Sequence, residues 1–193
     1  MPAYVLADAL RRQIGIVDAT SAYETVGLYV ERDFGEDKVR ALLRHIKVGE
    51  PPSPKVHVIP VCYELGEDLS DVSSRLGIST EDLVALHSSE TYRCYAIGFC
   101  PGFAFLGYLP DAIAGLPRRE SPRVKVPAGS VGITGKQTGV YPMETPGGWN
   151  LIGRTPLCLV DVSDTYFPIS AGDAVRFRPI DQEQFEELKG KRL

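Results

Sequence analysis

The spacing of apolar residues in the first part of the chain alternates between helical and strand-like periods. This pattern predicts helices over residues 3–12, 37–46, 68–77 and 80–88, and strands over residues 24–31 and 55–63. Ser79 and Asp82 form a start like a capping box for the last of these helices. Gly77 is suited to end the helix before it, because glycine readily adopts the left-handed conformation of a C-terminal cap.

Beyond Ser88 the pattern changes to short apolar runs separated by glycine and proline, ending in residues 173–180 and a polar C-terminal helix. A succession of short strands and turns is typical of a β-barrel or sandwich. We therefore expect an α+β chain with a first lobe over residues 1–88 and a barrel-like lobe over residues 89–193. Within the first lobe, the prolines of residues 49–55 exclude a helix interior and predict a turn or short linker.

The stretch from Gly98 to Pro156 differs in composition from the rest of the chain. It holds 11 of the 19 glycines, 8 of the 15 prolines and the only tryptophan, Trp149. It carries six basic residues against three acidic ones, although the whole chain has a formal net charge of −4. Glycine allows the backbone to approach a ligand closely, and proline fixes the backbone. The stretch therefore predicts a rigid, irregular surface with local positive charge.

A series of sequence words in this stretch carries a family resemblance. They are GFCPGF (98–103), the Pro-Arg pairs at 117–118 and 122–123, VPAGSV (126–131), QTGVYP (137–142), PGGW (146–149) and LIGRTP (151–156). The chain resembles the family of 5-oxoprolinase B-type subunits, which is similar to allophanate hydrolase subunit 1 and to a sporulation histidine-kinase inhibitor. The resemblance runs from about Ala3 to Ile180 and includes PVCYE (60–64), GEDL (66–69) and the Leu86-His87 pair.

The resemblance implies a small N-terminal α/β sandwich lobe followed by a cyclophilin-like β-barrel lobe. Members of the family usually have an opening strand ahead of the first helix, whereas this chain starts directly at that helix. Either the start site is placed late or the first lobe lacks that strand. Strand 24–31 or strand 55–61 is then expected to have one unpaired edge. An exposed strand edge invites association with another chain.

Several familiar catalytic patterns fail on inspection. GITGKQT (132–138) would need glycine at 130 and Ser or Thr at 137 to be a phosphate-binding loop, and the chain has Ser130 and Gln137. AGSVG (128–132) resembles a hydrolase nucleophile elbow, but Ala128 replaces the first glycine. The histidines share no motif with a serine or cysteine, and no set of residues has metal-ligand spacing, so we predict no catalytic triad and no metal site. The four cysteines lack a CxxC pair and are predicted to be reduced core thiols.

The remaining polar groups of the stretch predict a site for a small, polar or anionic substrate. Arginine presents a planar fork that matches carboxylate or phosphate oxygens, while the alternative for each arginine is a surface or interface ion pair. The predicted substrate-binding residues, which we expect to converge on one concave surface, are Arg118, Arg123, Ser130, Gln137, Tyr141, Trp149 and Arg154. Arg154 is the strongest candidate among them. The catalytic residues stay unassigned.

The resemblance implies a subunit of an ATP-dependent 5-oxoprolinase complex, which opens 5-oxoproline to glutamate. This chain alone is expected to be inactive. ATP would be bound at the level of the complex, because this chain shows no nucleotide motif. The implied partners are a paralogous second barrel subunit and a lactam-utilisation subunit. The alternatives are an allophanate hydrolase or urea carboxylase-type carboxyltransferase subunit and a binding module that inhibits a histidine kinase. The sequence words are common to all three.

Charge and hydropathy limit the kinds of partner and the location expected for the protein. The sequence pI of about 5.4 and the lack of a basic helix argue against a nucleic-acid partner. No apolar run reaches the length of about 18 residues that a membrane helix needs. We expect a cytoplasmic protein, since the N-terminal residues do not have the pattern of an export signal.

Overall fold

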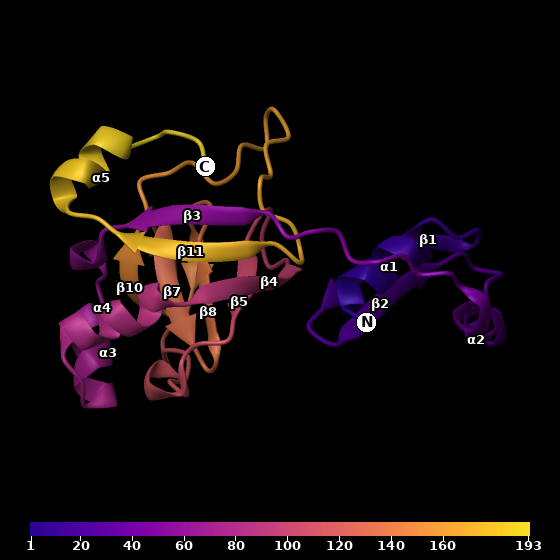
Figure 1. Cartoon of the computed structure of the whole chain (residues 1–193), viewed down its shortest axis with the longest axis horizontal. Coiled ribbons are helices and arrows are strands. Elements are labelled where there is room, and N and C mark those ends of the chain that lie inside the picture. The colour runs from indigo at the N-terminus through magenta and orange to yellow at the C-terminus, as the bar shows by residue number, and fades with distance from the viewer. The chain divides into compact units, whose positions relative to one another are not determined.

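The computed structural model describes residues 1–193, which form two compact units, Met1–Pro54 and Lys55–Leu193 (Figure 1). The boundary falls in the proline-rich segment that the sequence predicts as a linker. It differs from the expected boundary near residue 88, because residues 55–88 belong to the second unit. They do so because β3 (Val56–Val61) pairs in parallel with β11 (Ala174–Pro179) along its whole length. Local periodicity contains no signal for a pairing between such distant segments.

The first unit packs one helix against a β-hairpin. Its elements are α1 (Ala3–Arg11), β1 (Ile16–Ala22), β2 (Thr25–Val30) and α2 (Glu36–His45). The core is formed by Ala7 and Leu10 of α1 and by Ile16 and Ala19 of β1. β1 and β2 form a two-stranded sheet, so β2 has one edge without a strand partner in this chain. The predicted unpaired edge of strand 24–31 is therefore present.

The second unit is built on a seven-stranded sheet that curls into a barrel. In spatial order its strands are β10 (Asn150–Arg154), β7 (Ser130–Thr134), β8 (Gln137–Val140), β5 (Ala104–Gly107), β4 (Thr91–Ile97), β11 and β3. The two end strands meet where Cys62 and Arg154 exchange backbone hydrogen bonds of 2.9 and 3.0 Å. This pair nearly closes the barrel, and the predicted α+β class with a barrel lobe is confirmed.

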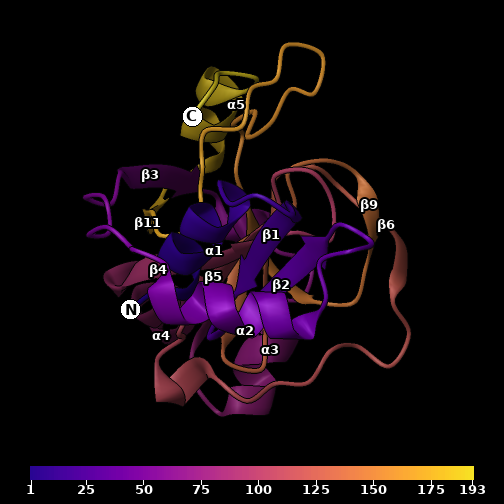
Figure 2. The same cartoon turned by 90° about the vertical axis from the view of Figure 1, so that its right-hand side faces the viewer.

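The remaining elements cover the barrel and connect its strands. They are η1 (Tyr63–Leu65), α3 (Leu69–Leu76), α4 (Thr80–Ser89), η2 (Asp111–Ile113), β6 (Arg123–Val126), β9 (Thr145–Gly147) and α5 (Gln182–Leu188). β6 and β9 run side by side as a separate two-stranded ribbon (Figure 2). The predicted cap of α4 is present, since the Ser79 side chain accepts from the Asp82 N–H at 3.0 Å. Gly77 ends α3 with a left-handed φ of 69°. None of the helices has the length and apolar character required to traverse a lipid bilayer.

One buried carboxylate attaches residues 117–123, which we call the basic loop, to strand β10 of the barrel. Asp68 is only 4% exposed, and its Oδ1 accepts from Arg119 Nη1 at 2.8 Å and from Arg123 Nη2 at 2.7 Å. Its Oδ2 accepts from the Leu151 N–H of β10 at 2.7 Å, and the Asp68 N–H donates to the Leu151 carbonyl at 2.8 Å. Arg123 Nε also donates to Glu67 at 3.1 Å. The Asp68 side chain therefore joins the start of α3, strand β10 and the basic loop.

A buried histidine links α4 to the barrel wall. His87 is fully buried, with Nδ1 at 2.7 Å from the Tyr63 hydroxyl and Nε2 at 2.8 Å from Thr138 Oγ1. Thr138 donates to the Gly132 carbonyl at 3.2 Å, so it accepts from Nε2–H, and Nδ1 accepts from Tyr63. Burial lowers the pKa of His87 to about 3, because the interior disfavours the charged imidazolium. The ring is therefore neutral and keeps one tautomer.

The Asp68→Asn substitution should destabilise the barrel unit. It leaves two partly buried guanidinium groups without their shared counter-charge, which should cost about 2–4 kcal/mol of unfolding free energy. Urea denaturation measures the loss. Asp111→Asn makes the same chemical change at an exposed position and should cost less than about 0.5 kcal/mol. Equal midpoints for the two variants would contradict the assigned role of Asp68.

His87 should make the protein acid-sensitive. In the unfolded chain the His87 imidazole returns to its ordinary pKa of 6.5, so between pH 6.5 and 3 the unfolded state binds more protons than the folded state. Stability contributed by His87 is therefore complete above pH 6.5 and falls as the pH drops, by up to about 1.4 kcal/mol per pH unit. Unfolding free energies measured from pH 7 to pH 4 should show a shallower decline for His87→Gln. His45→Gln, at an exposed position, should keep the slope of the parent protein.

Candidate functional site

A small cavity of about 70 Å³ lies within the region that the composition of the sequence singles out. Its lining residues all fall between Gly98 and Pro156: Phe99, Phe103, Phe105, Arg118, Tyr141, Gly147, Gly148 and Trp149. They come from the start of β5, the chain after β8, the turn before β10 and the basic loop ahead of β6. Separate strands and loops of the barrel unit therefore supply one concave site.

Aromatic rings form the walls of this cavity. Phe103 contacts Tyr141 and Trp149 edge-to-face, with ring centroids 5.1 and 5.4 Å apart. Phe105 packs tilted against Phe103 at 4.9 Å. Such edge-to-face contacts hold the rings in fixed orientations beyond the effect of area burial alone. The walls are therefore preformed and apolar.

Tyr141 brings a polar group to the aromatic wall. A Cβ at position 147 would lie 2.5 Å from its hydroxyl oxygen, so only glycine fits there. Burial raises the pKa of Tyr141, while a backbone hydrogen bond with Trp149 and the charges of Arg118 and Arg123 oppose that rise. The hydroxyl therefore stays protonated at neutral pH.

Phe99 is an exposed aromatic residue with unusual backbone geometry. Its φ is +69°, and its side chain is 64% exposed at the cavity. Positive φ is costly for a residue with a bulky side chain and occurs at tight turns and at functional sites. Phe99 contacts Phe103 and Tyr141 at ring centroid distances of 5.5 and 6.4 Å. The word GFCPGF thus places one phenylalanine in the wall and another at the opening.

The arginines of the basic loop divide between two tasks. Arg119 and Arg123 are committed to Asp68, and Arg119 Nε and Arg123 Nη1 are buried without a hydrogen-bond partner. Arg118 is exposed and lines the cavity. Arg118 is therefore the one arginine that lines the aromatic cavity, while Arg119 and Arg123 are paired with Asp68.

The structure brings together three of the predicted site residues, Arg118, Tyr141 and Trp149. Ser130 is buried next to Tyr141, whose N–H donates to the Ser130 carbonyl at 2.9 Å. Arg123 forms internal ion pairs with Asp68 and Glu67, which is the alternative to a substrate contact for an arginine of this stretch.

Two further predicted residues lie outside the cavity lining. Gln137 pairs with Thr134 and Gly107 at the turn end of the β7–β8 hairpin, the opposite end from Ser130. Arg154 lies at the end of β10, where its Nε donates to the Ala128 carbonyl at 3.0 Å. Substrate binding by the full set of seven remains a prediction.

The two motif resemblances resolve into strand structure. GITGKQT forms the end of β7, a turn and the start of β8, rather than a strand, a loop and a helix. Its backbone N–H groups are therefore not arranged to cradle phosphate. Ser130 begins β7, so AGSVG is not the strand-to-helix turn of a nucleophile elbow. Burial raises the pKa of the Cys100 thiol, which disfavours the reactive thiolate.

Sequence reasoning missed the phenylalanines of the cavity and Asp68. Phe99, Phe103 and Phe105 were available in and next to GFCPGF, and their crowding beside glycine and proline was the signal. Asp68 lies in GEDL, a word that carries the family resemblance but indicates no chemical role by itself.

Comparisons with known proteins identify a family and several relatives of this chain. The family described as carboxyltransferase domain, subdomain C and D, matches residues 3–168. The B-type subunit of 5-oxoprolinase from Bacillus subtilis (strain 168) is 47% identical over 134 residues, which is 68% of this chain and 55% of that protein. Its counterpart from Escherichia coli O157:H7 is 50% identical over 131 residues, which is 66% of this chain and 60% of that protein. The chain thus matches little more than half the length of these relatives.

Solved structures share the fold. The protein TTHA0988 superposes with a TM-score of 0.83 at 42% identity, over 93% of this chain and 37% of that one. The protein PH0987 from Pyrococcus horikoshii gives a TM-score of 0.64 at 36% identity, over 95% of this chain and 88% of that one. The Kluyveromyces lactis urea carboxylase gives 0.74 at 18% identity, over 96% of this chain and 20% of that one, which establishes a common fold alone. Because the family match covers most of its length, this chain belongs to the carboxyltransferase domain family, subdomain C and D.

Proposed function

We propose that the chain acts as the B-type subunit of an ATP-dependent 5-oxoprolinase, a complex that opens the cyclic amide 5-oxoproline to glutamate. The observation that carries the proposal is its 47% identity over 134 residues and 50% identity over 131 residues to two proteins named as B-type subunits of 5-oxoprolinase. The likeness to urea carboxylase, at 18% identity, supports the carboxyltransferase alternative through the fold only. No observation favours a histidine-kinase inhibitor over the first reading.

The cavity is chemically suited to part of this substrate. 5-Oxoproline is a five-membered ring that contains the amide and carries a carboxylate. The Arg118 fork matches the carboxylate, since two parallel N–H donors fit its two oxygens. The aromatic lining by Phe103 and Trp149 suits the apolar part of the ring, and Tyr141 adds a hydroxyl to the same lining. This chain would thus hold and orient the substrate.

The cavity is too small to be a complete site. Its volume of about 70 Å³ is well below the roughly 300–1,000 Å³ typical of pockets that enclose a small ligand. We propose that a partner subunit completes the enclosure, in line with the expected paralogous barrel subunit and lactam-utilisation subunit. Ser130, Gln137 and Arg154 would then contribute only where the partner extends the site.

ATP belongs to the complex rather than to this chain in the proposal. The segment most similar to a phosphate loop is a β-hairpin turn, so it does not form the strand-to-helix loop that binds a nucleoside triphosphate. We therefore assign no step involving ATP to these residues. Their proposed task is to bind the carboxylate, orient the ring and exclude water from one side of it.

The isolated chain should have no 5-oxoprolinase activity. ATP-dependent release of glutamate from 5-oxoproline should be absent from the purified chain and should appear when the paralogous barrel subunit and the lactam-utilisation subunit are co-expressed and co-purified with it. Full turnover by the chain alone would overturn the proposed division of labour. Carboxylation of urea by the co-purified complex would instead support the carboxyltransferase alternative.

Arg118→Lys should reduce kcat/KM of the assembled complex at least about tenfold, or roughly 1.4 kcal/mol, because lysine cannot form the bidentate contact with a carboxylate. Arg178→Lys makes the same change at an exposed position on β11, outside the cavity, and should leave activity unchanged. Equal activities of the two variants would exclude Arg118 as the carboxylate ligand. A tenfold loss for Arg154→Lys would extend the site to the end of β10.

A further inference from the structure

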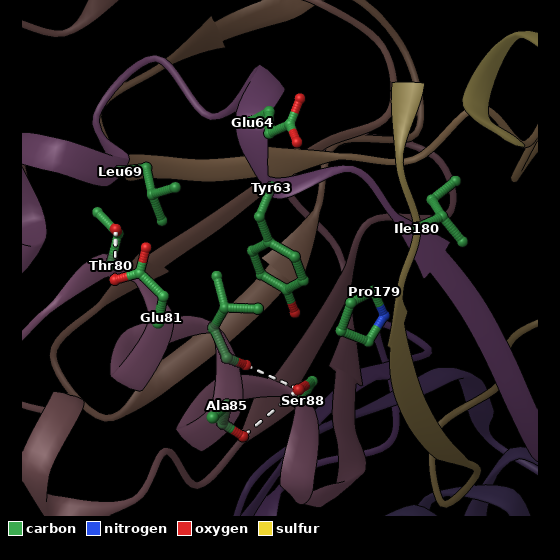
Figure 3. Close-up of a pocket in the computed structure, with 10 residues that line it drawn as sticks. Tyr63, Glu64, Leu69, Thr80, Glu81, Ala85, Ser88, Pro179 and Ile180 are labelled. Atoms are coloured by element: carbon green, nitrogen blue, oxygen red, sulfur yellow. Dashed lines mark hydrogen bonds between the residues drawn. The ribbon is translucent and has the colours of Figure 1, made fainter. Parts of the chain in front are cut away.

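A second and larger cavity, of about 520 Å³, lies on a different part of the barrel unit. It is enclosed by η1, the start of α3, the helix α4 and the end of β11, and it shares no lining residue with the aromatic cavity (Figure 3). Its lining residues are Tyr63, Glu64, Leu69, Thr80, Glu81, Val84, Ala85, Ser88, Pro179 and Ile180. We call this cavity the acidic cleft.

The floor of the acidic cleft is apolar and rigid. Figure 3 shows the Tyr63 ring in the middle of the cleft, between Leu69 on one side and Pro179 on the other. The Tyr63 hydroxyl is fixed by its hydrogen bond to the buried His87. Leu69 and Val84 pack against the main hydrophobic core, so the walls continue the core outward. An apolar group that enters this space meets a preformed surface.

The charge of the cleft has one sign. Glu64 and Glu81 are both exposed lining residues, and no lysine or arginine lines the cleft. Glu64 accepts from the neutral Gln182 Nε2 at 2.8 Å, and Glu81 accepts from the neutral Thr80 hydroxyl at 3.1 Å. These hydrogen bonds orient the carboxylates without neutralising them. Asp181, whose charge acts on the neighbouring Cys62 together with that of Glu64, adds a further negative charge nearby.

An apolar floor with exposed acids beside it has the anatomy of a protein docking pocket. Anchor side chains at interfaces fill apolar pockets, and a polar rim surrounds them. The carboxylates belong to exposed side chains, whereas the Tyr63 ring at the floor is 4% exposed, so a cation would pair at the rim while an apolar group fills the floor. We propose that the acidic cleft binds a segment of a partner protein in which an apolar side chain is flanked by lysine or arginine. This site goes beyond the function proposed for the aromatic cavity and does not depend on it.

A peptide titration of the full chain tests the proposal. The probe is acetyl-Lys-Leu-Leu-Lys-amide, and the matched control is acetyl-Glu-Leu-Leu-Glu-amide, each followed by backbone amide NMR shifts. The basic peptide should give saturable shifts confined to residues 63–69, 80–88 and 179–182, and it should bind at least about tenfold more tightly than the acidic one at low salt. Equal shifts for both peptides, shifts elsewhere or no shifts at millimolar peptide would overturn the proposal.

Two kinds of variant separate charge from shape. Glu81→Gln and Glu64→Gln should each weaken binding of the basic peptide at least about threefold, whereas Glu120→Gln, an exposed acid outside the cleft, should not. Ala85→Leu, at an exposed helical position in the lining, should narrow the cleft and weaken binding of the basic peptide at least about tenfold, whereas Ala41→Leu on α2 should not. Undiminished binding to Ala85→Leu would refute the cleft as the site. Spermidine is the small-molecule probe: if it matches the peptide in affinity and shift pattern, the ligand is a free polyamine and the docking proposal fails.

Discussion

The carboxylate of Asp68 is the interaction on which the arrangement of the barrel unit depends. It is buried, and it accepts hydrogen bonds from two guanidinium groups and one backbone N–H, all far from Asp68 in the sequence. Without this counter-charge, Arg119 and Arg123 would have no electrostatic reason to lie against β10 and the start of α3. Because Arg119 and Arg123 turn inward to this carboxylate, Arg118 is left at the cavity. One acid thus decides which arginine is structural and which is available to a ligand.

The fold could be predicted from the sequence wherever the signal was local. The helix ends at Ser79 and Gly77 and the change from helical to strand-like periods all depend on neighbouring residues. The boundary between the compact units was not local. It depends on the pairing of β3 with β11, in which two segments read separately as apolar strands become neighbours in one sheet. Periodicity identifies a strand but does not identify its partner.

The sequence predicts the location of the candidate site, but only some of the residues that line its cavity. Density of glycine, proline and arginine indicates the stretch that holds the cavity, and three of the seven predicted substrate-binding residues, Arg118, Tyr141 and Trp149, line it. Gln137 was grouped with them because it is close in sequence, but antiparallel pairing places it at the far end of its hairpin. Arg123 met an acid more than fifty positions earlier in the chain, and no spacing rule relates the two. The phenylalanines were overlooked because an aromatic residue in a sequence is more often core than cavity wall.

The meeting of Cys62 and Arg154 gives the barrel a seam. Fewer backbone hydrogen bonds join the two end segments here than join neighbouring strands elsewhere in the sheet. Local opening of the barrel should therefore cost the least free energy at this pair. The Asp68–Leu151 backbone pair continues this seam, and η1, which begins the acidic cleft, follows directly from it. A molecule that binds only the closed cylinder would therefore stabilise the whole unit by its own binding free energy. In the proposed complex, a partner that binds only the closed cylinder would therefore also raise the folding stability of the barrel unit.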